Sequence, residues 1–153
     1  MYILDVEASG FDPESYPIEV AFTNLKTGES DQFLINPGFA SDWDYWSEAA
    51  ERVHGISLDA LSRSGVSPCE ALYRLEKLSN QQVFTDAPRF DELWLARLYD
   101  EMQDKPRYML QDIRSLVAKE NQEAMEREME TISPPHRAMA DVEMLVKLVR
   151  RYT

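Results

Sequence analysis

The feature that most constrains this chain is a pair of carboxylates inside its first apolar stretch. Residues 1–7, Met-Tyr-Ile-Leu-Asp-Val-Glu, have the β-prone composition of a central strand but include Asp5 and Glu7. Because side chains alternate along a strand, the two acids share one face and project roughly 6.5–7 Å apart. Their repulsion is about 2.5 kcal/mol at an effective dielectric of about 20, and a divalent cation between them would reverse its sign. The alternative is an edge strand with a solvated polar face.

The length and composition indicate one globular domain spanning residues 1–153. Of the residues, 44% are hydrophobic and 29% charged, which is ordinary for such a domain. No apolar run approaches the roughly 20 residues of a membrane span, and we see no signal peptide. We therefore expect a cytoplasmic protein without a membrane partner. The one cysteine, Cys69, excludes a disulfide framework and a Cys-based zinc site, and we expect it to face the core from a helix.

The net charge of −12 argues against a protein that binds nucleic acid through a basic face. The argument weakens for a metal-dependent site, because clustered acids make the metal-free chain acidic and the ions then supply local positive charge. The charge therefore predicts weak, non-processive binding of a polyanion and does not exclude it.

The hydrophobic pattern predicts an α/β fold. Two strands at residues 18–25 and 32–35 are joined by a short glycine-containing link, and with the first strand they form a three-stranded antiparallel meander. Further strands are expected at residues 81–85 and 107–110. Helices are expected at residues 43–54, 67–78, 90–102 and 137–151, with a short one opening at Ser57; the polar stretch 119–130 is a solvated helix or a mobile loop. Such an order predicts a mixed central sheet flanked by helices on both faces.

Two of the expected helices also carry an acid on their apolar face. Asp141 lies between Ala138 and Leu145 in the core stripe of the last helix, and Asp91 shares a face with Leu95. A carboxylate facing a core costs several kcal/mol unless something neutralises it. One shared cation site explains the acids of the strand and of both helices better than three accidents do.

His136 precedes Asp141 by five residues and follows a proline pair. The prolines favour a position at the start of the helix, from which the ring reaches the same site. The alternative is a surface or capping histidine.

These acids and the histidine fall in three segments that follow one another along the chain. The segments are Asp5-Val6-Glu7, Phe90-Asp91-Glu92-Leu93-Trp94-Leu95 and His136-Arg137-Ala138-Met139-Ala140-Asp141. They resemble the three motifs of the DEDD (DnaQ-like) 3′–5′ exonucleases, in the branch whose third motif is His-x-Ala-x-x-Asp (DEDDh). The segment 53–57, Val-His-Gly-Ile-Ser, resembles a helix-ending element common between the first two motifs. The resemblance spans nearly the whole chain and implies a ribonuclease H-like fold.

The second motif departs from the family pattern. In the family it usually opens with His-Asn, followed by two residues and then Phe-Asp. Here residues 85–89, Thr-Asp-Ala-Pro-Arg, precede Phe90 and Asp91, which is one residue more than in that pattern and includes no His-Asn. Asp86 is therefore an alternative to Asp91 as the acid of this motif. We favour Asp91, because it heads the amphipathic helix whereas Asp86 closes a strand.

The resemblance implies a mechanism with two metal ions. Asp5, Glu7, Asp91 and Asp141 would hold two Mg²⁺ or Mn²⁺ ions, for which carboxylate oxygens are suitable ligands. His136 would be the general base that deprotonates the attacking water. The product would be a nucleoside 5′-monophosphate released from the 3′ end of single-stranded RNA or DNA.

The substrate is less well defined by the sequence. Family members grip the terminal nucleotide beside the first motif, where Ala8, Ser9 and Phe11 stand here. Phe11 either stacks on a base or packs into the core. Short exoribonuclease-like members are similar in size to this chain, which slightly favours RNA over DNA. The sequence leaves open the length of the substrate and whether two copies form a homodimer.

Three other functions remain as alternatives. The first is a non-catalytic module that binds nucleic acid or protein on the same fold, but the four acids and the histidine are all present. The second is a ribonuclease H-type endonuclease, which would lack a histidine five residues before the last acid. The third is a metal-dependent phosphatase acting on small nucleotides.

Overall fold

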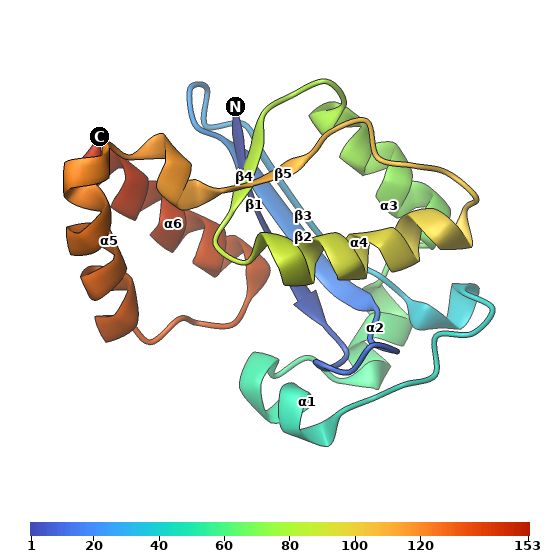
Figure 1. Ribbon diagram of the computed structural model, residues 1–153. Coiled ribbons are helices and arrows are strands. Elements are labelled where there is room, and N and C mark those ends of the chain that lie inside the picture. Colours follow the sequence, from blue (N-terminus) through green and yellow to red (C-terminus); the bar gives the residue numbers. More distant parts are fainter.

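A mixed five-stranded sheet in the order β3-β2-β1-β4-β5 forms the centre of the molecule, which the computed structural model describes over residues 1–153 (Figure 1). The strands are β1 (Tyr2–Ala8), β2 (Pro17–Asn24), β3 (Ser30–Leu34), β4 (Val83–Thr85) and β5 (Leu110–Asp112). The α-helices are α1 (Glu48–His54), α2 (Leu58–Ser64), α3 (Pro68–Leu75), α4 (Pro88–Glu101), α5 (Lys119–Thr131) and α6 (Ala138–Tyr152). Short 3₁₀ helices are η1 (Pro37–Phe39), η2 (Glu76–Leu78) and η3 (Ile113–Leu116).

The sheet combines an antiparallel meander with parallel strands, as the sequence predicted. β1 pairs with β2 and β2 with β3 in antiparallel fashion, whereas β1 with β4 and β4 with β5 are parallel. In the β1–β2 ladder, Glu7 lies opposite Glu19. Because β1 and β4 are parallel, Glu7 and the residues that follow Thr85 lie at the same edge of the sheet.

The alternation of side chains along β1 divides the core into two layers. Tyr2, Leu4 and Val6 pack on the face covered by α3 and α4. Ile3 packs on the opposite face, in a cluster to which α6 contributes most of its buried residues. Figure 1 shows α5 and α6 on one side of the sheet and α3 and α4 on the other. Asp5 shares the face of Ile3 and therefore points toward α6.

One predicted helix begins later than expected. The helix expected at residues 43–54 starts at Glu48, because Ser47 is its N-cap and accepts a hydrogen bond from the Ala50 N–H at 3.1 Å. Trp43 lies outside the helix and stacks on Tyr16 in the core, with ring centroids 5.2 Å apart.

Two further expectations differ from the structure. The strand expected at residues 107–110 is β5, which begins only at Leu110. Cys69 is exposed, so its predicted core-facing position was wrong: the buried side chains of α3 after its first proline are Ala71, Leu72 and Leu75. The stretch at 119–130 is helical, with Met125 buried. None of the helices has the length and apolar character needed to cross a membrane.

Candidate active site

Two buried carboxylates in this structure each have one oxygen without a hydrogen-bond partner. Asp5 is 9% exposed, and its Oδ2 atom is enclosed without a partner. Asp141 faces inward from the first turn of α6, and its Oδ1 atom is likewise buried without a hydrogen-bond partner. Because buried polar atoms are nearly always paired, two unpaired carboxylate oxygens indicate a ligand that the polypeptide does not itself supply.

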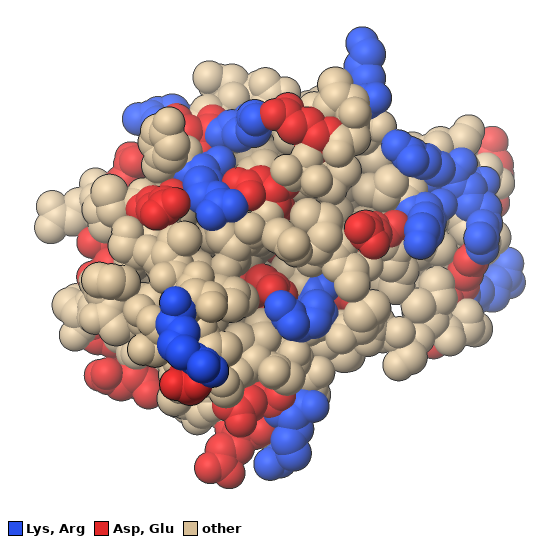
Figure 2. Space-filling view, turned by 180° about the vertical axis from the view of Figure 1, so that it is seen from behind, with Lys and Arg blue, Asp and Glu red and all other residues tan.

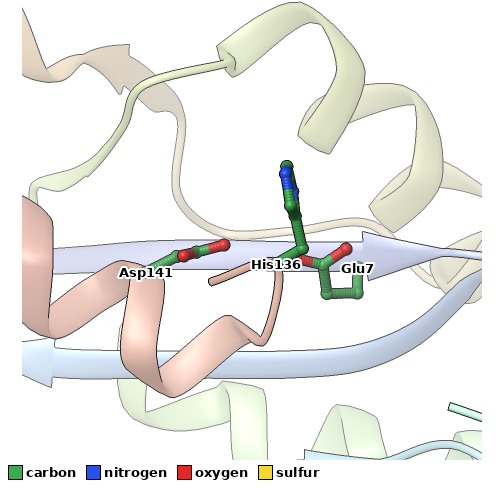
Figure 3. Close-up of side chains that lie close together, drawn as sticks. All are labelled: Glu7, His136 and Asp141. Carbon is green, nitrogen blue, oxygen red and sulfur yellow. The ribbon is translucent and has the colours of Figure 1, made fainter. Parts of the chain in front are cut away.

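Glu7, His136 and Asp141 form the first of two groups of ligand atoms. One oxygen or nitrogen from each lies within 4.8 Å of the others. In Figure 3, Asp141 points from the first turn of α6 toward Glu7 of β1 and His136, which lies on the segment leading into the helix. His136 has a φ of +56°, a left-handed conformation that costs a non-glycine residue about 1–3 kcal/mol.

Asp5, Asp86 and Asp91 form the second group, again with ligand atoms within 4.8 Å of one another. Asp91 is 1% exposed in the first turn of α4 and accepts a hydrogen bond from the Thr85 hydroxyl at the end of β4. Asp86 is half-buried and lines an open cavity of about 500 Å³ together with Arg114. The structure therefore brings both candidates for the second motif to Asp5.

Burial in the cluster raises the pKa values of its carboxyl groups. Burial raises the pKa of Glu7 to about 8, and the nearby carboxylates of Asp141 and Glu19 contribute. Burial also raises the pKa of Asp91 to about 8, although the bond from Thr85 opposes the shift. Burial and the neighbouring Asp91 raise the pKa of Asp5 well above its usual range. A cation would offset both the burial and the repulsion, and pKa values raised in this way are typical of functional sites.

Three aromatic side chains lie beside the acid cluster. Phe11 is 72% exposed, and its ring centroid lies 6.1 Å from that of Phe90 and 6.2 Å from that of Trp94. Core packing of Phe11 is thus ruled out. Sequence reasoning did not single out Phe90 and Trp94 as its neighbours, although their spacing of four residues in a helix places them on one face next to Asp91. These three residues, Phe11, Phe90 and Trp94, are called the aromatic platform below.

The other two residues expected near the terminal nucleotide are buried. Ser9 accepts a hydrogen bond from the Tyr16 N–H at its side chain, and its own N–H and C=O bond to Tyr16 and Ser47. Ala8 is buried at the end of β1. Of the three expected residues, only Phe11 presents its side chain to solvent.

The charges are unevenly distributed over the surface. Figure 2 shows the back of the molecule, where basic side chains gather on the side formed by α5 and α6. The last turn of α6 carries Arg150 and Arg151. The net charge of −12 therefore coexists with a local basic region.

The mixed five-stranded sheet in this order, flanked by helices on both faces, defines the class of fold: it is ribonuclease H-like. Structures of exonuclease I are among the solved structures that are similar to this chain. A structure of exonuclease I that addresses how processivity is achieved has a TM-score of 0.73 and 19% identity over 99% of this chain. E. coli exonuclease I in complex with a dA16 oligonucleotide has a TM-score of 0.74 and 18% identity over 99% of this chain. Exonuclease I from Methylocaldum szegediense has a TM-score of 0.69 and 21% identity over 98%.

This chain spans about two fifths of those proteins: 41%, 41% and 40% of their lengths, respectively. No family model matches the sequence. No curated protein matches it either. The similarity confirms the fold expected from the resemblance to the DEDD exonucleases.

Proposed function

We propose that this chain is a metal-dependent 3′–5′ exonuclease that hydrolyses single-stranded nucleic acid to nucleoside 5′-monophosphates. The observation that carries the proposal is the pair of adjacent ligand groups, Glu7–His136–Asp141 and Asp5–Asp86–Asp91. They stand on a fold that exonuclease I shares. A non-catalytic module would have no use for two unpaired buried carboxylate oxygens beside a histidine.

The donor set fits hard divalent cations. Every ligand atom but one is a carboxylate oxygen, and no thiolate is present, which favours Mg²⁺ or Mn²⁺ over soft metals. The unpaired oxygens of Asp5 and Asp141 are free to ligate. When bound, two such ions would activate a water nucleophile and stabilise the charge that develops on the scissile phosphate and the leaving oxygen.

Each residue then has a defined role. Glu7 and Asp141 would hold one ion and Asp91 would hold the other, and Asp5 would contribute an oxygen to each. The Thr85 hydroxyl fixes the orientation of the Asp91 carboxylate.

His136 is the general base. It would remove a proton from the attacking water as the water oxygen bonds to phosphorus. The bond from phosphorus to the 3′-oxygen breaks, and the released 3′-oxygen takes up a proton from solvent. Such a base contributes typically 10²–10⁴-fold to the rate.

The aromatic platform supports a single-stranded substrate. Stacking of a base on an aromatic ring contributes about 1–3 kcal/mol and requires a base that is free of its partner strand. Exonuclease I structures with dA16 and dT13 oligonucleotides favour DNA as the first substrate to examine, with RNA of the same sequence as the alternative.

The experiment uses 5′-labelled single-stranded DNA and RNA of equal sequence with Mg²⁺ or Mn²⁺. We expect a ladder that shortens one nucleotide at a time from the 3′ end, and no ladder from the Asp5→Asn variant. An oligonucleotide with a blocked 3′ end is the matched substrate control. Internal cuts in an RNA–DNA hybrid would instead identify a ribonuclease H-type endonuclease.

A further inference from the structure

Beside the acid cluster, Glu19 of β2 and Arg137 form an ion pair that the proposed chemistry does not use. Glu19 is 4% exposed, whereas the Arg137 side chain is half-exposed. Arg137 donates from Nε to both carboxylate oxygens at 3.1 and 3.3 Å, and from Nη2 to Oε2 at 2.8 Å. A forked contact of this kind fixes the orientation of the guanidinium as well as its position.

Glu19 also caps α6. Its Oε1 accepts a hydrogen bond from the Ala138 N–H at 2.8 Å, whereas the N-cap residue Arg137 makes no side-chain cap of its own. The first N–H groups of a helix need an outside acceptor. In α1, α2 and α3 that acceptor is a local serine at the N-cap. In α6 it comes from a central strand, so the start of this helix is tied to the sheet.

The residues that Glu19 contacts, Arg137 and Ala138, follow His136 directly in the sequence. His136 has a φ of +56°, which a non-glycine residue keeps only when its surroundings enforce it. On its C-terminal side the chain is held by the fork from Arg137 and by the Arg137 carbonyl, which accepts from the Asp141 N–H at 2.9 Å. Glu19 itself lies opposite Glu7 in the β1–β2 ladder. The contacts of Glu19 with Arg137 and Ala138, called the clamp below, are therefore anchored on the same strand pair as Glu7.

We propose that Glu19 is a positioning residue: through Arg137 and the N-terminus of α6, it holds His136 against Glu7 and Asp141. The inference rests on the proposed function, because the kinetic consequence requires His136 to act in the reaction. Glu19 touches neither substrate nor reacting atoms and acts only through its neighbours.

The kinetic test compares Glu19→Gln with a matched control. The control is Asp31→Asn, since Asp31 of β3 accepts the same kind of fork from Arg74 but belongs to neither ligand group. Misplacing a reacting group by about 1 Å costs on the order of a hundredfold, so we expect Glu19→Gln to lower kcat by about ten- to a hundredfold with an unchanged KM. Asp31→Asn should leave kcat unchanged. Arg137→Lys, which keeps the charge without the fork, should give an intermediate kcat.

A double mutant separates positioning from general loss of structure. In the His136→Ala background, Glu19→Gln should change kcat by less than about twofold, because residues that act as a unit are not additive. An equal loss of kcat in both backgrounds, or an equal loss from Asp31→Asn, would overturn the proposal.

A structural measurement distinguishes failure of this inference from failure of the proposed function. In Glu19→Gln, amide hydrogen exchange should show lost protection at Ala138, and the NMR spectrum should show a shifted His136 ring resonance. Neither change should occur in Asp31→Asn. If the wild-type chain cleaves no oligonucleotide, the proposed function fails while this measurement still tests the clamp. Unchanged protection and an unchanged His136 resonance would refute the clamp.

Discussion

A carboxylate oxygen of Asp5 on β1 lies within 4.8 Å of one from Asp91 on α4, and both side chains are buried. Two buried carboxylates at this separation cannot both remain ionised without a counter-charge, so they either retain a proton or hold a cation. The stability of the fold should therefore depend on pH and on divalent metal.

Without metal, stability should fall as the pH rises. Glu7 has an ordinary pKa of 4.5 that the fold raises to about 8, and Asp91 is raised similarly. Between those values the folded state binds more protons than the unfolded state, so the stabilisation present below pH 4.5 is lost as the pH passes through about 8. Calorimetry in EDTA should therefore give a Tm several degrees lower at pH 8 than at pH 5. A higher Tm at pH 8 would show that these groups are not buried in the uncharged form.

The two acids of the second motif should differ in their effects. Asp91→Asn removes a fully buried ligand and should abolish hydrolysis, whereas Asp86→Asn, at the half-buried edge of the same group, should lower kcat by about 10–100-fold. Asp59→Asn on the surface of α2 serves as the control for loss of one negative charge. Full activity of the Asp91 variant would reverse the assignment and give the role to Asp86.

Loss of the imidazole should separate chemistry from metal binding. His136→Ala should lower kcat by about 10²–10⁴-fold, the usual contribution of a general base. The rise in Tm on adding Mn²⁺ should persist in this variant, because four acids still bind the ions. If the Mn²⁺ response disappears together with the activity, His136 is a metal ligand and not a base.

The aromatic platform should act on substrate binding. Phe11→Ala should raise KM about 5- to 150-fold, which corresponds to about 1–3 kcal/mol of lost stacking, with a smaller change in kcat. Phe39→Ala is the matched control, since Phe39 is exposed to a similar extent in η1 and contacts no other ring. An unchanged KM in the Phe11 variant would show that the aromatic platform does not bind the substrate.

Much of the fold was predictable because its signals are local. The alternation in β1 and the glycine link between β2 and β3 indicated the meander, and the acids within apolar stripes indicated a shared site. The start of α1 was misplaced because Trp43 is apolar but packs on Tyr16 in the core, outside the helix. Cys69 was misplaced because one residue in the first turn of α3 gives little information about which face it occupies.

The contacts that complete the site were not predictable from local patterns. Arg137 and Glu19 are 118 residues apart in the sequence and meet only through the register of β2 with the start of α6. Likewise, the spacing between Asp86 and Asp91 suggested a competition between two acids, whereas the turn from β4 into α4 brings both to Asp5.

Anomalous scattering from crystals grown with Mn²⁺ is the most direct test of the central claim that these acids hold divalent ions. We predict two peaks, one among Glu7, Asp141 and Asp5 and one among Asp5, Asp86 and Asp91. A crystal of active protein in millimolar Mn²⁺ with no peak at either position would contradict the account.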